Sequence, residues 1–108
     1  MFINGEWRDA AGGKSFDVVN PADSSVISSV PDGGAEDARA AIEVADAAFP
    51  MWSHTTAYER ADILMKAHRL MMERREELAR TMTEEQGKPL AEARGEVLYA
   101  ASFVEFYA

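Results

Sequence analysis

The chain has 108 residues and a formal net charge of −8 at pH 7; 47% of its residues are hydrophobic and 28% are charged. This length predicts one domain or part of one, able to bury roughly two-thirds of the surface of the unfolded chain. The acidic balance argues against nucleic-acid binding, which requires clustered Lys and Arg. No apolar run reaches the roughly 18 residues that a membrane helix needs, so no membrane partner is expected.

Cysteine is absent, which excludes disulfides, thiolate zinc sites and a cysteine nucleophile within these residues. The absence of cysteine is also in keeping with a reducing compartment. The amino terminus is not typical of a signal peptide, because Asn4, Glu6 and Asp9 interrupt it before any apolar run of useful length. We therefore expect a cytoplasmic protein.

Short strands and turns are predicted at the start of the chain. Asn4-Gly5 lies between apolar residues and favours the type I′ turn of a β-hairpin, since both central residues of that turn need a positive φ. The alternating segment Ser15–Val19 predicts a strand that ends at Asn20-Pro21. Residues 25–30 predict a further strand, closed by Pro31 and the turn that follows it.

From residue 35 the apolar period changes from two to 3.6, which indicates helices. Residues 35–49 predict a helix that ends at Pro50, because proline lacks the amide donor that an interior helical position requires. Met51 and Trp52 are expected to fold back over this helix as an apolar lid. Its predicted apolar face consists of Ala38, Ala41, Ile42, Ala45, Ala48 and Phe49.

The segment Thr56-Ala57-Tyr58-Glu59 has the form of a capping box and predicts a helix start. The apolar stripe that follows supports one helix or two over residues 56–84. A single helix of roughly thirty residues is long for a globular protein, so we expect a bend near Glu73–Glu76. The stripe consists of Ile63, Leu64, Ala67, Leu70, Met71, Leu78, Ala79 and Met82.

The break at Glu85–Pro89 separates this segment from the next helix. A Gly just past a helix end takes the left-handed conformation, and a Pro shortly afterwards suits the start of another helix. Gly87-Lys88 lacks the upstream Gly and the following Ser or Thr of a phosphate-binding P-loop. The break is therefore interpreted as a helix stop and restart.

Residues 90–108 predict a helix that is apolar on most sides and must be buried on most sides. One stripe consists of Ala93, Val97, Ala100, Ala101, Val104 and Ala108, while Leu90, Leu98, Phe103, Phe106 and Tyr107 occupy other faces. The chain offers little else to cover this helix, and no stop signal follows Tyr107. We expect a piece of a larger protein, whose isolated form self-associates through residues 90–108 or by exchange of strands within residues 2–19.

Catalytic signals are missing from the residues themselves. His54 and His68 are the only histidines, and neither belongs to a metal-binding His-Glu-x-x-His pattern. No serine lies in a Gly-x-Ser-x-Gly elbow, and no Gly-x-Gly-x-x-Gly turn is present. Composition and spacing alone thus indicate an incomplete α/β segment without a catalytic constellation.

Four passages, in this order and spacing, resemble the amino-terminal part of the NAD(P)-dependent aldehyde dehydrogenases, and the resemblance covers the whole chain. They are Phe2–Trp7, Phe16–Ala22, Ala41–Phe49 with Trp52, and Glu84–Ala93. Within that family, residues 85–96 followed by Tyr99–Phe103 look most like the succinate-semialdehyde dehydrogenase branch.

The resemblance implies an α/β fold in which amino-terminal β-hairpins are followed by three or four α-helices. Residues 1–108 would form an incomplete segment of the Rossmann-like cofactor-binding domain. Its parts would be hairpins and strands over 1–31 and helices over 35–49, 56–84 and 90–108. The family tends to homo-oligomers, formed through segments outside this chain.

The resemblance also implies the chemistry of the parent enzyme. A cysteine thiolate attacks an aldehyde, here succinate semialdehyde, hydride passes to NAD or NADP, and a glutamate-activated water releases the carboxylate. All of those residues lie downstream in the family, so no catalytic or cofactor-binding residue is assigned here. The 108 residues alone are expected to be structural and inactive.

One minor site carries over by resemblance. Some relatives hold a monovalent cation, K⁺ or Na⁺, with oxygens at positions that correspond to Val18, Val19 and Glu85. The alternative that these are ordinary strand and helix-end residues stays open. The alternative function, a stand-alone helical interaction or self-association module, would need a stop signal after Ala108.

Overall fold

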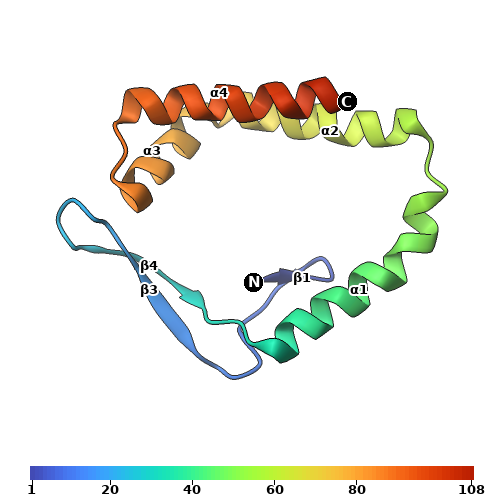
Figure 1. Ribbon diagram of the computed structural model, residues 1–108, viewed down its shortest axis with the longest axis horizontal. Helices are drawn as coiled ribbons and strands as arrows, with labels where there is room; N and C mark the ends of the chain where they lie inside the picture. Colours follow the sequence, from blue (N-terminus) through green and yellow to red (C-terminus); the bar gives the residue numbers. More distant parts are fainter. The chain divides into compact units, whose positions relative to one another are not determined.

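The computed structural model describes residues 1–108 as two antiparallel β-hairpins followed by four helices (Figure 1). The strands are β1 (Phe2–Ile3), β2 (Glu6–Trp7), β3 (Ser15–Val19) and β4 (Val26–Pro31), and the helices are α1 (Ala35–Ser53), α2 (Ala57–Glu73), α3 (Arg75–Gln86) and α4 (Leu90–Tyr107). The predicted α/β class and the predicted order of elements are therefore confirmed. None of the four helices combines the length and the hydropathy that crossing a membrane requires.

The chain divides into two compact units. The hairpin unit comprises Met1–Val19 and Val26–His54, and the helical unit comprises Asn20–Ser25 and Thr55–Ala108. The loop between β3 and β4 thus belongs with the helices, although the strands that it joins do not.

The hairpins follow the turn signals in the sequence. Phe2 pairs with Trp7 across the first hairpin, and Asn4 and Gly5 between the strands have φ values of 57° and 79°. The positive values at both positions are those of the predicted type I′ turn. In the second hairpin Val18 pairs with Ser28 and Val19 with Val26, which leaves Ile27 unpaired in a β-bulge.

Helix α1 is longer than predicted, and the expectation that Pro50 ends it is wrong. The helix continues to Ser53, so Met51 and Trp52 lie within its last turn and do not fold back as a lid. Pro50 has no amide hydrogen, so it cannot donate the intrahelical hydrogen bond to the Asp46 carbonyl. Separately, the Pro50 carbonyl lies at the helix end and accepts hydrogen bonds from Ser53 Oγ at 2.9 Å and from His54 Nδ1 at 2.6 Å.

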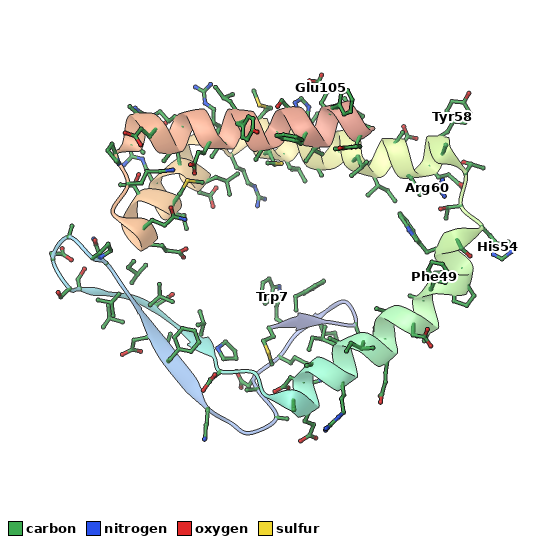
Figure 2. The ribbon with its side chains drawn as sticks, viewed as in Figure 1. Trp7, Phe49, His54, Tyr58, Arg60 and Glu105 are labelled. Atoms are coloured by element: carbon green, nitrogen blue, oxygen red, sulfur yellow. The ribbon has the colours of Figure 1, made fainter.

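The predicted apolar face of α1 is not buried within these residues. Ile42 is 67% exposed and Phe49 is 64% exposed; Phe49 projects from the later part of the helix (Figure 2). Only Ala40 and Val44 are half-buried between residues 38 and 50. The periodicity correctly predicted a helix, but its face meets no partner in the described chain.

The long apolar segment forms two helices, as the expected bend implied. The Thr56 hydroxyl accepts the Glu59 amide, and the Glu59 carboxylate accepts the Thr56 amide at 2.7 Å, so the predicted capping box is confirmed. Arg74, with φ −97° and ψ 15°, separates α2 from α3. The break lies inside the predicted range Glu73–Glu76.

The core of the helical unit is small and consists mainly of alanine. Helix α4 lies along α2 and also packs on α3 (Figure 1). The buried side chains are Ala79, Ala93, Val97 and Ala101, with Met82 and Leu90 packed against this cluster. Ala100 and Ala108, which the sequence placed in the same stripe, are exposed. On other sides of α4, Tyr99, Phe103, Phe106 and Tyr107 are exposed.

Candidate functional site

The two histidines do not form a catalytic or metal-binding pair. His54 caps the carboxyl end of α1 (Figure 2), where its Nδ1 lies 2.6 Å from the Pro50 carbonyl. Because a carbonyl only accepts hydrogen bonds, this Nδ1 must carry a proton. His68 lies in α2, and its buried Nδ1 has no hydrogen-bond partner. No group of three or more His, Cys, Asp or Glu side chains is placed to hold a metal ion.

The predicted cation ligands lie at element ends. Val18 and Val19 are the last two residues of β3, and the β-bulge interrupts the strand ladder between them. The residue that this bulge leaves outside the ladder is Ile27 of β4, while Val18 and Val19 keep Ser28 and Val26 as partners. Glu85 lies in the last turn of α3 and is exposed. A common cation for these three residues stays a prediction.

The connection between α3 and α4 is ordered around Gly87. Gly87 has φ 72° and ψ 10°, and its amide donates to the Thr83 carbonyl at 2.8 Å. This is the predicted left-handed helix end. A Cβ on Gly87 would lie 3.0 Å from Cγ of Pro21 in the β3–β4 loop. Both its left-handed conformation and the close approach of Pro21 thus favour glycine at this position.

Two ion pairs fix α4 against its surroundings. Lys88, in the connection, pairs with Glu96 of α4. Glu76 of α3 accepts two hydrogen bonds from the Arg94 guanidinium, at 2.8 Å from Nε and 2.7 Å from a terminal nitrogen. Arg80 adds a contact at 3.4 Å. The Arg94 hydrogen bonds lower the pKa of Glu76 to about 2. Glu76, although its side chain is 46% exposed, therefore links α3 to α4.

Asp37 is the one buried polar side chain, and the sequence did not single it out as buried. It is 4% exposed, and its carboxylate accepts the Gly34 amide at 3.0 Å and the Ala11 amide at 3.0 and 3.3 Å. Arg8 lies 3.8 Å away. The Gly34 and Ala11 hydrogen bonds, with a smaller contribution from Arg8, hold the pKa of Asp37 below its ordinary value.

A sequence signal for Asp37 was present. An acid three residues after a helix N-cap reaches back to the N-cap amide, as in a capping box. Here Gly34 is the N-cap and Asp37 is that third residue. The local signal explains the Gly34 contact, while the Ala11 contact, 26 residues away along the chain, is a product of the fold.

Comparison with known proteins shows to which family this chain belongs. The sequence profile of the aldehyde dehydrogenase family matches residues 7–108. The chain belongs to the aldehyde dehydrogenase family. It is 57% identical, over 98% of its length, to the NADP(+) succinate-semialdehyde dehydrogenase GabD of Escherichia coli strain K12. It is 53% identical, over 99% of its length, to the glutarate-semialdehyde dehydrogenase of Pseudomonas putida strain KT2440.

A solved structure gives the same result for the fold. A crystal structure described as an E. coli NADP-dependent enzyme superposes with a TM-score of 0.94 at 57% identity over 96% of this chain. The chain spans 22% of that structure and 22% of each of the two curated relatives. The family resemblance inferred from the sequence motifs is confirmed, and the match lies in the amino-terminal part of the relatives.

Proposed function

We propose that these residues are the amino-terminal segment of an NAD(P)-dependent aldehyde dehydrogenase that oxidises succinate semialdehyde to the dicarboxylate. The observation that carries the proposal is the 57% identity to GabD over 98% of the chain. The 53% identity to a glutarate-semialdehyde dehydrogenase supports an ω-carboxylated aldehyde as the substrate class. The stand-alone interaction module is less favoured, because a family match covers residues 7–108.

The residues present do not supply the reaction centre of such an enzyme. The chain contains no Cys to act as the nucleophile and no Gly-x-Gly-x-x-Gly turn to hold a nicotinamide cofactor. Within the proposal, the segment is part of the Rossmann-like cofactor-binding domain and contributes packing and cation binding. The thiolate and the cofactor site belong to the remainder of the enzyme. A cytoplasmic homo-oligomer is part of the same proposal.

The cation site belongs to the proposal as well. The carbonyls of Val18 and Val19 and the carboxylate of Glu85 are oxygen ligands of the type that K⁺ or Na⁺ prefers. A thermal unfolding series of the whole enzyme in K⁺, Na⁺ and choline salts tests it. A stabilisation by K⁺ or Na⁺ over choline, reduced in Glu85→Gln, is expected; identical curves in all three salts remove the site.

The decisive experiment for the enzyme uses the whole coding region, read past Ala108. The expressed protein is assayed for reduction of NADP⁺ and of NAD⁺ with succinate semialdehyde, glutarate semialdehyde and a short aldehyde without a carboxylate. We expect the highest kcat/KM with succinate semialdehyde and no activity from residues 1–108 alone. A stop codon directly after Ala108, or aldehyde-dependent reduction by the 108-residue chain itself, would overturn the proposal.

A further inference from the structure

The turn of the first hairpin places two groups side by side that can react with each other. Asn4 and Gly5 form this turn, with φ values of 57° and 79°. The side-chain amide of an asparagine can be attacked by the backbone nitrogen of the next residue, and glycine hinders the attack least because it has no Cβ. A Cβ on Gly5 would meet nothing within 4 Å, so the space beside this residue is open.

The chain has two asparagines, and only Asn4 suits this reaction. Asn4 is exposed, and its side-chain amide makes no hydrogen bond within the described residues. Asn20 is half-buried, and its side-chain oxygen accepts the Ala22 amide at 2.9 Å. Asn20 is also followed by Pro21, whose nitrogen carries no hydrogen and cannot act as the nucleophile. One chain therefore contains both a reactive asparagine and an unreactive reference.

The closed turn holds the reacting atoms apart, so the hairpin must open before they meet. In a type I′ turn the first central residue has ψ near about 30°, which directs the Gly5 nitrogen away from the Asn4 side chain. The strands β1 and β2 have two residues each, and their rings, Phe2 and Trp7, have centroids 5.3 Å apart. A two-stranded hairpin of this length is marginally stable and opens at a low cost in free energy.

We propose that Asn4 is a site of spontaneous deamidation and that its rearranged product opens the first hairpin. The Gly5 nitrogen loses its proton to the solvent and bonds to Cγ of Asn4. The bond from Cγ to the side-chain nitrogen breaks, and ammonia leaves with a proton taken back from the solvent, which closes a succinimide ring. Water then opens the ring at either carbonyl and leaves an aspartyl or an isoaspartyl residue at position 4. In total, one water is taken up and one ammonia is released.

The isoaspartyl product no longer fits the turn. Its main chain runs through the former side chain, which adds one backbone atom between Ile3 and Glu6, the pair that closes the turn. A two-residue turn fixes the register of its strands, so the longer linkage separates Phe2 from Trp7. The aspartyl product has an ordinary backbone and keeps the turn, since Asp-Gly also favours type I′. Both reacting groups lie in one turn, so the reaction requires no partner surface and no enzyme activity.

The test uses the whole enzyme, expressed from the complete coding region and stored in mildly alkaline buffer, which removes the amide proton faster. Peptide mapping by mass spectrometry follows each asparagine, and an isoaspartyl methyltransferase detects the rearranged product. We expect Asn4 to be converted while Asn20 in the same sample stays unmodified. The enzyme unfolded in urea is the positive control for Asn4. If Asn4 of the native enzyme survives as long as Asn20 while the unfolded sample is converted, the proposal is overturned.

The matched variant is Asn4→Gly, because Gly-Gly also forms a type I′ turn and has no side-chain amide to lose. Hydrogen exchange at Arg8, whose amide donates to the Met1 carbonyl at 2.8 Å, reports whether the hairpin is closed. During storage the isoaspartyl fraction should lose this protection, whereas Asn4→Gly should keep it. Asn4→Asp, measured before storage, should keep it as well. Protection retained in the isoaspartyl fraction, or lost to the same extent in stored Asn4→Gly, would overturn the proposal.

Discussion

In the helical unit the buried side chains are apolar, whereas in the hairpin unit the centre of the structure is a carboxylate. Ala79, Ala93, Val97 and Ala101 bring α4 onto α2 and α3. In the hairpin unit only Ala10 is a buried apolar residue, while Asp37 joins the residue 8–11 loop to the start of α1. One unit relies on non-directional apolar burial, and the other on directional hydrogen bonds from backbone amides.

The difference predicts different responses to substitution. Apolar burial tolerates changes at exposed positions but not charges at buried ones. A buried carboxylate that accepts backbone amides fixes the position of those amides, and its loss leaves them unpaired. Substitutions in one unit should therefore be detected first by the exchange rates of amides in that same unit.

The largest effect is expected from Ala101→Asp. Ala101 is 1% exposed on the packed face of α4, and an unpaired charge there should cost more than about 3 kcal/mol and unfold the helical unit. Ala100→Asp is the matched control, because Ala100 is the adjacent residue and is exposed. This substitution should change stability by less than about 1 kcal/mol. Hydrogen exchange resolved by residue measures both. Equal loss of protection in the two variants would contradict the assigned helix face.

Asp37→Ala should have the next largest effect, confined to the hairpin unit. The Ala11 and Gly34 amides lose their acceptor, so their exchange should speed up by roughly an order of magnitude or more. Glu36→Ala, at the exposed neighbouring position, is the control. Because the folded pKa of Asp37 is depressed below 3.8, its contribution is complete above that pH and lost as the pH falls further. Unchanged exchange at Ala11 in Asp37→Ala would show that Asp37 does not organise this loop.

Features that depend on a few consecutive residues could be read from the sequence. The Asn4-Gly5 turn, the Thr56–Glu59 cap and the Gly87 helix end are each determined by backbone chemistry within one turn. The end of α1 could not be read in this way, since the helix continues through Pro50 to Ser53, where Ser53 and His54 side chains bond the Pro50 carbonyl. The contact of Asp37 with Ala11 depends on residues distant in the sequence and was missed for that reason.

For function and for packing, too, local sequence features could be interpreted and contacts between distant segments could not. The motifs predicted the family because it is encoded in the order of several local segments. The chain has no Cys and no Gly-rich cofactor turn, so no catalytic or cofactor-binding residue could be assigned in it. Periodicity predicted which segments of the chain are helical but not which face of α1 is covered, because covering depends on surfaces elsewhere. No surface in the described chain covers Ile42 or Phe49, and both side chains are exposed.

Gly87→Ala should destabilise the helical unit by about 1–3 kcal/mol, from left-handed backbone strain and from the contact with Pro21. The same substitution at Gly95 should stabilise α4 by up to about 1 kcal/mol, since Gly95 is an exposed helical position with free space around it. Urea unfolding, compared at one protein concentration for both variants, measures both. Effects of the same sign at the two glycines would contradict the assigned conformations.

The smallest effect is expected at Glu76, whose half-exposed carboxylate can be compared with the buried carboxylate of Asp37. The pKa of Glu76 is lowered from 4.5 to about 2, so the unfolded chain takes up the proton first as the pH falls. The contribution of Glu76 is therefore complete above about pH 4.5 and lost progressively towards pH 2. Glu76→Gln should remove this part of the pH dependence, while Glu77→Gln, at the adjacent exposed position, should not.

Salt distinguishes the two carboxylates. The side chains of Glu76 and Arg94 are 46% and 43% exposed, so water and ions screen their attraction. Raising the ionic strength to roughly 1 M should flatten the pH dependence that Glu76 contributes to the helical unit. The pH dependence of Ala11 exchange, which reports on the buried Asp37, should change much less, because its main partners are backbone amides. Equal salt sensitivity at both sites would mean that the two units do not differ in the way that their carboxylates are held.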